Sequence, residues 1–429
     1  MSDKRYDYVI VGNSTAAVAA VESLRTQDME GTLAVISREP QAAYCAPLIT
    51  YVLAGKIPEE QLAYRPADFY ERMKVETLLG AEVTELRPEA HEVVLADGTT
   101  IGYGKLLLAT GGTPIVPPLP GVDLAGVYTF TRYEDMCRVR EYLEHRQVNE
   151  AVVVGGGMIG VKTAEALVKL GIKTTIVELL DRVLAQALDE KGSVAARRAL
   201  ADGGVRVVTS TGATGLGGSE VGVVGVQLDS GETLPAQLVI MAIGVRPNTT
   251  LAQAAGCAVK RGVIVNDHMQ TSLPDVYAAG DVAEGYDVLL GESRPVAIWP
   301  SAYLQGQVAG ANMAGSDTAY EGSVAMNSIQ ICGLPTISVG LTNAAPGDEV
   351  LESTSANGRD YRRIVIRDGK IVGAIFVGDI DRAGIITGLI RDAIDVSDFK
   401  HKLIGRDLGM LSLPKDYRLH QVMGPGIEV

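Results

Sequence analysis

The chain has 429 residues, which allow two to four domains, and its balance of 47% apolar and 21% charged residues is ordinary for a water-soluble protein. Its formal net charge of −14 repels nucleic acid and anionic membranes, so we expect neither as a partner. No apolar run approaches the roughly 20 residues of a membrane-spanning helix. The N-terminal segment enters a strand without a signal-peptide pattern, so we expect a cytoplasmic protein.

The cysteines and histidines argue against several kinds of site. None of the four cysteines belongs to a CxxC or CxxxxC pair, which disfavours a disulfide framework, a structural zinc site and iron–sulfur ligation within the chain. The five histidines are scattered without metal-ligand spacing, so we expect no metal site. The cysteines are Cys45, Cys137, Cys257 and Cys332.

The first predicted strand, turn and helix come from YDYVIVGNSTAAVAAVESLR, residues 6–25. The turn begins at Gly12, and a serine and an alanine replace the second and third glycines of a dinucleotide-binding GxGxxG turn. The acid expected after the next strand is displaced, because Ser37 stands there and Glu39 follows two residues later. By itself this segment fits a nucleotide site and ordinary strand–helix–strand packing equally well.

Two shorter segments precede the next turn. AAYCAPLITYVLAGK, residues 42–56, holds Cys45 without a second cysteine in CxxxxC spacing. YGKLLLATGGTP, residues 103–114, predicts a strand that ends in small residues at Thr110 and Gly111.

A second strand, turn and helix follow in VVVGGGMIGVKTAEALVKLGIKTTIVE, residues 152–178. Gly155 permits the turn, Gly157 lets the backbone approach a pyrophosphate, and Gly160 lets the helix pack closely on the strand. The helix N-terminus offers unpaired N–H groups to phosphate. Glu178 ends the next strand, where a carboxylate binds both ribose hydroxyls and repels a 2′-phosphate. Because no cation follows it directly, the segment predicts a site for NAD(H) rather than NADP(H).

A later strand and helix suit a flavin. TSLPDVYAAGDVAE, residues 271–284, ends a strand at Gly280, and the carboxylate of Asp281 can accept hydrogen bonds from a ribityl chain. The helix predicted over residues 299–315 can aim its N-terminus at the electron-rich end of an isoalloxazine and stabilise the reduced, anionic form. Further on, residues 361–379 predict a hairpin with an Asp-Gly turn, and residues 382–396 predict a helix.

Five motifs in chain order resemble those of the two-dinucleotide-binding flavoproteins, the FAD-dependent pyridine nucleotide–disulfide oxidoreductase superfamily. They are VIVGNSTAA, LLLATGGTP, VVVGGGMIG, MAIGVRPNT and VYAAGDVAE. The resemblance implies an α/β fold with two Rossmann-like domains, FAD at the first turn and NAD(H) at the second. It implies an FAD domain of residues 1–120 and 246–320, interrupted by an NAD domain of residues 121–245. Residues 321–429 would form a C-terminal α+β domain of a kind that usually makes a dimer interface.

The resemblance also implies which residues contact the cofactors. Contacts to FAD are expected from Gly12, Ser14, Thr15, Ala16, Ser37, Arg38, Glu39, Pro47, Val83, Thr110, Gly111, Arg132, Asp281, Trp299 and Ala302. Contacts to NAD(H) are expected from Gly155, Gly157, Met158, Ile159, Gly160, Glu178 and Gly244.

Two positions near the expected flavin depart from the family. Members that reduce coenzyme A disulfide, sulfur or oxygen use one cysteine, usually within CGLPY, and Cys45 lacks that setting, so it is either a redox thiol or a small packing residue. Many members pair a lysine with the glutamate of GxIGxE next to flavin N5, and here Tyr51 and Lys162 stand at about those positions. Lys162 is expected on the helix surface; the alternative is a cation over the flavin.

The segment RAGIITGLI and the loop around Cys45 look most like flavin subunits of multi-subunit iron–sulfur oxidoreductases, such as phenylglyoxylate dehydrogenase and tungsten aldehyde oxidoreductase. The leading hypothesis is therefore an enzyme that passes electrons between NAD(H) and an iron–sulfur partner or subunit through FAD, as a homodimer or in a heteromeric complex. The alternative is a Cys45-dependent coenzyme A disulfide or sulfur reductase, or an NADH oxidase. The intact NAD motif disfavours a non-enzymatic scaffold.

Overall fold

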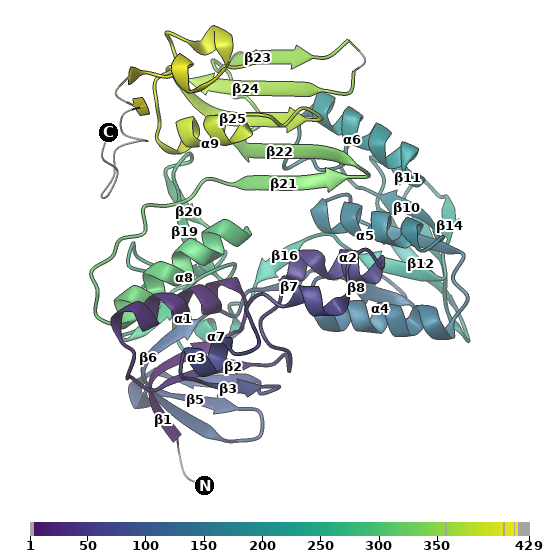
Figure 1. Ribbon diagram of the computed structural model, residues 1–429. Coiled ribbons are helices and arrows are strands. Elements are labelled where there is room, and N and C mark those ends of the chain that lie inside the picture. Colours follow the sequence, from purple (N-terminus) through teal and green to yellow (C-terminus); the bar gives the residue numbers. More distant parts are fainter. Residues whose placement is uncertain (1–3, 357, 406–407, 416, 419–429) are drawn as a thin grey trace.

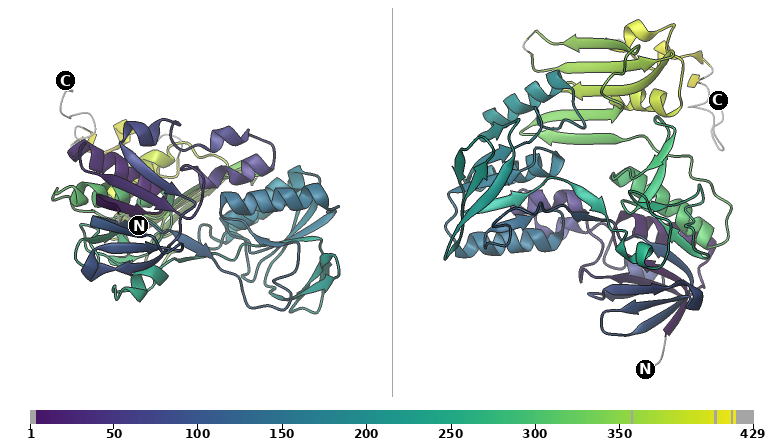
Figure 2. Two further views of the ribbon diagram at one scale, coloured as in Figure 1. Left: turned by 90° about the horizontal axis from the view of Figure 1, so that it is seen from below. Right: turned by 180° about the vertical axis from the view of Figure 1, so that it is seen from behind.

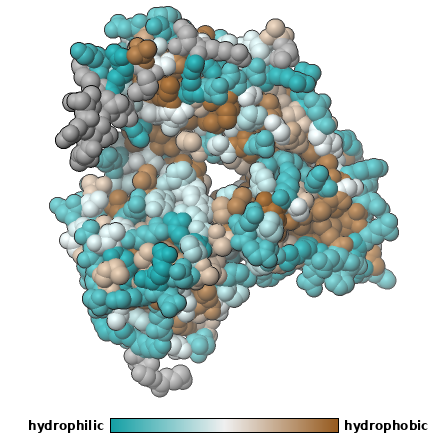
Figure 3. All heavy atoms as spheres, viewed as in Figure 1, coloured by the Kyte–Doolittle hydropathy of each residue, from teal (hydrophilic) through white to brown (hydrophobic). Residues whose placement is uncertain are grey.

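The computed structural model describes residues 4–356, 358–405, 408–415 and 417–418 and contains three lobes, each built around its own sheet (Figure 1). Within these residues, no helix is long and apolar enough to cross a membrane. In the space-filling view the surface is hollowed where the three lobes meet (Figure 3).

The first lobe is a mostly parallel sheet in the order β3-β2-β1-β6-β5-β4, with β18 paired to the end of β6. Its strands are β1 (Lys4–Val11), β2 (Leu33–Ser37), β3 (Val75–Leu79), β4 (Val83–Arg87), β5 (Glu92–Leu95), β6 (Thr100–Leu108) and β18 (Val276–Ala278). Its helices are α1 (Thr15–Gln27), α3 (Phe69–Arg72), α7 (Thr250–Ala254) and α8 (Trp299–Met313). All five residues of β2 are buried, as an apolar run in a central parallel strand requires.

The second lobe has a five-stranded parallel sheet in the order β11-β10-β9-β15-β8 and a small antiparallel sheet, β12-β13-β14. The parallel strands are β8 (Val127–Thr129), β9 (Glu150–Val154), β10 (Lys173–Val177), β11 (Val205–Val208) and β15 (Leu238–Met241). The others are β12 (Ala213–Ser219), β13 (Gly222–Leu228) and β14 (Thr233–Pro235), with helices α4 (Tyr133–His145), α5 (Met158–Lys169) and α6 (Glu190–Asp202).

Short strands connect the lobes. The chain leaves the first lobe through β7 (Gly112–Pro114) and returns through β16 (Val245–Pro247), and these two strands pair antiparallel. A further small sheet joins β17 (Val263–Ile264), β19 (Ala283–Asp287) and β20 (Glu292–Arg294). The two parallel sheets, with the chain crossing between them twice, confirm the expected pair of Rossmann-like units.

The third lobe is an antiparallel sheet in the order β21-β22-β25-β24-β23. Its elements are β21 (Met326–Ile331), β22 (Leu334–Gly340), β23 (Glu349–Thr354), β24 (Tyr361–Arg367), β25 (Lys370–Val377) and α9 (Ala383–Arg391). The expected Asp-Gly turn is confirmed, because Asp368 and Gly369 both have positive φ, at 51° and 74°. The expected helix ends earlier than predicted, at Arg391, because Ala393 takes a left-handed φ of 50° and turns the chain so that Val396 is buried.

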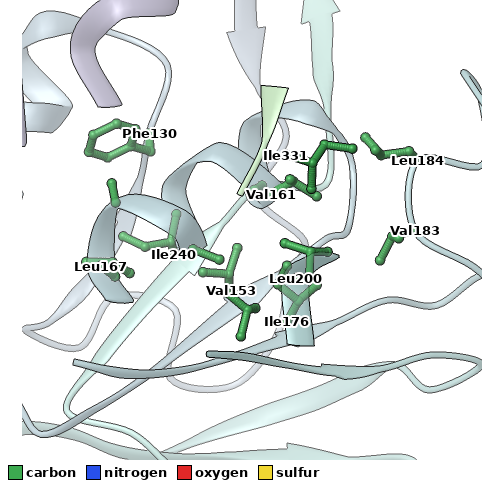
Figure 4. Packing of buried hydrophobic residues seen from close by; sticks show 14 of the residues in the cluster. Phe130, Val153, Val161, Leu167, Ile176, Val183, Leu184, Leu200, Ile240 and Ile331 are labelled. Atoms are coloured by element: carbon green, nitrogen blue, oxygen red, sulfur yellow. The ribbon is translucent and has the colours of Figure 1, made fainter. Parts of the chain in front are cut away.

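One apolar core joins the second and third lobes to the segment around α2, which lies between β2 and β3 in sequence. The helix α2 (Ile49–Leu53) precedes the second lobe in sequence, yet its Ile49 and Leu53 are buried with Val161 of α5 and with Ile331 and Val377 of the C-terminal sheet. Figure 4 shows Val161 beside Ile331 within this cluster. Figure 2 shows the C-terminal sheet lying against the side of the second lobe that carries α5 and α6. The remaining short helices are η1 (Ala46–Leu48), η2 (Glu59–Leu62), η3 (Pro88–Ala90), η4 (Lys400–Lys402) and η5 (Met410–Ser412).

Candidate functional site

The two predicted turns have the same construction. Gly12 follows β1 with a φ of +119°, and a Cβ atom there would lie 2.0 Å from the carbonyl oxygen of Ala109, just after β6. Gly155 follows β9 with a φ of +113°, and its Cβ would lie 2.4 Å from the carbonyl oxygen of Ala242, just after β15. Only glycine meets both conditions at either position. Each turn thus brings a helix N-terminus to the carboxyl edge of a parallel sheet.

The second turn has room for a ligand backbone. Gly157 immediately precedes α5, and a Cβ there would meet no protein atom within 4 Å. Gly160 differs, because its Cβ would lie 1.9 Å from the carbonyl oxygen of Gly155, so this glycine serves close packing of the helix. Met158 and Ile159, the first residues of α5, are partly buried. Gly244, with a φ of +122°, follows β15, the parallel neighbour of β9.

Glu178 directly follows β10 and is held by the turn itself. Its carboxylate accepts a 2.6 Å hydrogen bond from the backbone N–H of Gly156 and a 2.8 Å hydrogen bond from that of Leu180. Each carboxylate oxygen retains acceptor capacity for a ribose hydroxyl. Glu178 is therefore oriented before any ligand binds.

At the first turn, two helices pack backbone to backbone. Cβ atoms on Gly306 and Gly310 of α8 would lie 2.2 and 2.3 Å from the carbonyl oxygens of Ala16 and Ala20 of α1, so the helices run parallel in close contact. Their N-terminal ends therefore point to the same side, where both helix dipoles favour an anion. The spacing of Gly306 and Gly310 was a sequence signal for this packing that the sequence analysis did not use.

Buried hydroxyls stand at these helix starts without protein partners. Thr15 lies in the first turn of α1 and Ser301 in the first turn of α8, and within the described part of the chain neither hydroxyl has a hydrogen-bond partner. Unpaired buried polar groups are unusual in folded proteins and indicate a missing ligand or water. These hydroxyls fit the phosphates of a dinucleotide. Ser301 is absent from the residues predicted by sequence.

Asp281 lies at the end of β18 in the same region. Burial raises the pKa of its carboxyl, and no described residue donates a hydrogen bond to it. Gln305 of α8 accepts a 2.8 Å hydrogen bond from the backbone N–H of the preceding residue, Gly280, and so supports this strand end. The side chains of Ala16 and Ala302 close in beside Gly280. A half-buried carboxylate to which no described residue donates fits a ribityl chain, whose hydroxyls supply the donors.

Asp281→Asn is expected to stabilise the apoprotein and to weaken FAD binding. Because its pKa is raised on folding, the folded state binds more protons, and its stability falls as pH rises through the window between the unfolded value, about 3.9, and the folded value. At pH 7 the carboxylate is ionised at a cost in desolvation that the neutral amide of asparagine avoids, so the melting temperature of the apoprotein rises. FAD binding weakens roughly tenfold, the cost of an imperfectly paired buried group. Calorimetry of apo and FAD-loaded protein measures both; Asp202→Asn, at an exposed position, is the control.

The other expected contacts of the first site lie around the end of β2. The backbone N–H of Ala81, after β3, donates to the carbonyl of Ser37 at 2.9 Å, which brings the start of β4, including Val83, toward this strand end. Glu39 accepts a 2.7 Å hydrogen bond from the hydroxyl of Tyr44. Its carboxylate also lies 3.9 Å from Nε of Arg132, so two of the expected contact residues that are far apart in sequence lie side by side.

The remaining residues that were expected to contact FAD lie on several different elements. Arg38 pairs with Glu82 at 3.6 Å on the surface. Thr110 donates from its hydroxyl to the carbonyl of Asn248 at 3.0 Å, and the carbonyl of Gly111 accepts from the N–H of that residue. Trp299, the first residue of α8, packs edge-on against Tyr64 with ring centroids 4.8 Å apart. Ser14 immediately precedes α1, and Pro47 lies in η1.

Cys45 stands at the start of η1 in a setting that does not activate a thiol. Burial raises its pKa, and the backbone N–H of Leu48 offsets this only in part. Since the nucleophile is the thiolate, a raised pKa lowers the reactive fraction of Cys45 near pH 7.

Lys162 was expected on the helix surface. This expectation is wrong, because the Lys162 side chain is only 14% exposed. Its ammonium lies 2.7 Å from the carboxylate of Glu165, donates to the carbonyl of Gln330 at 3.0 Å and sits 4.8 Å from the ring centroid of Tyr51. The two positions at which the family pairs a lysine with a glutamate therefore do touch here, but as a cation over a ring.

Comparison with known proteins agrees with these sites. Residues 6–306 match the family model described as pyridine nucleotide-disulphide oxidoreductase, and residues 326–394 match the rubredoxin NAD+ reductase C-terminal domain. The chain is 32% identical over 406 residues to the NADH-dependent phenylglyoxylate dehydrogenase subunit epsilon of Aromatoleum evansii, covering 94% of this chain and 96% of that protein. It is 32% identical over 319 residues to an NADH oxidase of Methanocaldococcus jannaschii, covering 73% and 71%.

Among solved structures, the covalent putidaredoxin reductase–putidaredoxin complex matches with a TM-score of 0.85 and 26% identity, covering 98% of this chain and 99% of that one. The family match spans both dinucleotide turns and all of the orphaned polar groups described above. The chain therefore belongs to the pyridine nucleotide–disulphide oxidoreductase family, as an NAD(H)-dependent flavoprotein oxidoreductase that uses FAD.

Proposed function

We propose that this enzyme passes electrons between NAD(H) and an iron–sulfur protein partner, or an iron–sulfur subunit of a larger complex. The observation that carries the proposal is the setting of Cys45, a half-buried thiol with a raised pKa and no neighbouring cysteine in sequence. An acceptor reduced through a thiol requires a reactive thiolate, whereas an iron–sulfur acceptor does not. The similarity to an epsilon subunit over nearly its whole length supports a role within a complex.

In this proposal each cofactor has its own turn. Gly12, Thr15 and Ser301 would hold the FAD phosphates, with Asp281 on the ribityl chain. Glu178 would bind the adenosine ribose of NAD(H) and orient the nicotinamide end toward the flavin. When bound there, FAD would supply the exchange between hydride transfer with NADH and single-electron transfer to the acceptor. The protein would orient the two cofactors, exclude water from between them and supply charged groups.

The finer assignments belong to the same proposal. The FAD domain would comprise residues 1–120 and 246–320, the NAD domain residues 121–245 and the C-terminal domain residues 321–429. That last domain would mediate a homodimer or a heteromeric complex, in the cytoplasm. Lys162 as a flavin neighbour also remains a prediction; a cation there would favour the reduced, anionic flavin.

A second function is a Cys45-dependent reductase of coenzyme A disulfide or sulfur, or an NADH oxidase. Its support is the 32% identity to an NADH oxidase. In that case Cys45 would need to ionise next to the flavin, against the burial that raises its pKa.

Cys45→Ser separates the two functions. If the acceptor is an iron–sulfur protein, the variant is expected to keep FAD and to keep most of its NADH-dependent reduction of a ferredoxin and of a viologen, within about twofold. Steady-state reduction of each acceptor measures this, with Cys137→Ser as the control for a half-buried thiol. Loss of both activities, with flavin still bound and still reduced by NADH, favours the thiol-dependent enzyme. Co-purification of iron–sulfur subunits from the native source tests the partner directly.

A further inference from the structure

Three segments from different parts of the fold meet at one carboxylate, Glu165 of α5. It accepts from the ammonium of Lys56, which follows α2, at 2.7 Å and from that of Lys162, on its own helix, at 2.7 Å. It also accepts from the backbone N–H of Cys332, at the tip of the β21–β22 hairpin, at 3.4 Å. The Glu165 side chain is only 13% exposed and that of Lys162 14%, whereas the Lys56 side chain is 36% exposed.

The two lysines complete a compact cluster. The ammonium of Lys162 also donates a 3.0 Å hydrogen bond to the carbonyl of Gln330 in the C-terminal sheet. The ring of Tyr51, on α2, lies near both cations, with its centroid 4.8 Å from the ammonium of Lys162 and 5.3 Å from that of Lys56. Burial raises the pKa of Glu165, but the two lysines outweigh it, and the net pKa is below its usual value, so the carboxylate is ionised at neutral pH.

The surrounding contacts are apolar. Ile49 and Leu53 of α2, Val161 of α5 and Ile331 of β21 belong to one buried cluster. Apolar burial holds these elements together but is non-directional, so it tolerates sliding of one surface on another. Charge-assisted hydrogen bonds are short and directional. Within this interface the Glu165 cluster is a directional contact made by α5 itself, whereas Asp189, with Tyr361 and Arg363, fixes the start of α6 to the same sheet.

The alignment of α5 matters for hydride transfer. Gly157, at the phosphate-binding turn, immediately precedes α5, two helical turns before Glu165. Movement of α5 relative to α2 would shift this turn relative to η1, which directly precedes α2 and holds the expected flavin contact Pro47. A displacement of about 1 Å between reacting groups can cost about 100-fold in rate.

We propose that Glu165 is a positioning residue for flavin reduction: through Lys56 it fixes the NAD-binding helix to α2, and through Lys162 and Cys332 it fixes the same helix to the C-terminal sheet. This role concerns the NAD(H) half-reaction and does not depend on which acceptor receives the electrons. Lys56→Met tests it best, because Glu165 and Lys162 remain as a balanced ion pair.

The limiting rate of flavin reduction at saturating NADH is expected to fall roughly 10- to 100-fold in Lys56→Met. FAD content, the dissociation constant for NADH and reoxidation of the reduced flavin by ferricyanide should change little. Stopped-flow spectra of the FAD-loaded enzyme give all of these quantities. The matched control is Lys169→Met, which makes the same substitution on the exposed end of α5. Lys56→Arg, which restores a donor to the carboxylate, is expected to recover most of the rate.

A double variant shows whether the effect passes through Glu165. In a Glu165→Gln background, Lys56→Met should cause much less additional loss than in the wild type, since residues that act through one contact are not additive. The proposal fails if Lys56→Met and Lys169→Met reduce flavin equally fast. It also fails if the two losses add fully, or if lower FAD content or weaker NADH binding accounts for the whole effect.

Discussion

Gly12→Ala is expected to give a protein that no longer retains FAD and is less stable by about 3–5 kcal/mol. Two costs combine at this position. The backbone has a φ of +119°, which side-chain-bearing residues rarely adopt, and the added Cβ would lie 2.0 Å from the carbonyl oxygen of Ala109. Because that oxygen belongs to the end of β6, relief of the clash moves the turn away from the sheet edge and distorts the start of α1.

Flavin absorbance per chain and urea unfolding measure the two effects of Gly12→Ala. Gly98→Ala is the matched control, since Gly98 has a φ of +85° but no atom within 4 Å of its added Cβ. The control carries the conformational cost without the clash and should keep its flavin. A Gly12→Ala protein with full flavin content and wild-type stability would contradict both the turn geometry and the assignment of FAD to it.

Glu178→Ala is expected to weaken NADH binding by about 1–3 kcal/mol, roughly 5- to 150-fold. The carboxylate is already oriented by the N–H groups of Gly156 and Leu180, so little entropy is lost when it accepts from ribose hydroxyls. Its removal takes away those acceptors and leaves both N–H groups without their side-chain partner. In the wild type, NADH should reduce the flavin far better than NADPH, because the same carboxylate repels a 2′-phosphate.

Rapid-mixing spectra with each nucleotide measure the effect of Glu178→Ala, and the preference for NADH should shrink in the variant. Glu220→Ala removes one negative charge from an exposed loop of the same lobe and is the control for a general change of charge. Equal reduction of the wild-type flavin by NADH and NADPH would contradict the prediction that Glu178 selects NADH.

Several features were predictable because short, contiguous patterns encode them. The turn at Gly155 is predicted by glycine spacing after an apolar strand, and that at Gly12 by one glycine followed by small residues after such a strand; each needs glycine for both φ and space. The hairpin turn at Asp368 was predicted for the same reason. The helix beyond it was predicted too long, since a periodic pattern continued past the point where the chain turns back to bury Val396.

The sequence by itself determined the dinucleotide turn at Gly155 and predicted NAD(H) there, since that turn is a local arrangement of strand, glycines, helix and acid. The turn at Gly12 lacks two of the glycines, and its assignment needed the five motifs in chain order. Only the tertiary structure decided the state of the charged and polar groups between the lobes. Lys56 and Glu165 are 109 residues apart and Lys162 and Gln330 are 168 apart, so no local pattern signals either contact. The burial of Lys162, the raised pKa of the Cys45 thiol and the raised pKa of the Asp281 carboxyl, to which no described residue donates, all follow from which surfaces the fold brings together, because burial and neighbouring charges set ionisation and hydrogen bonding.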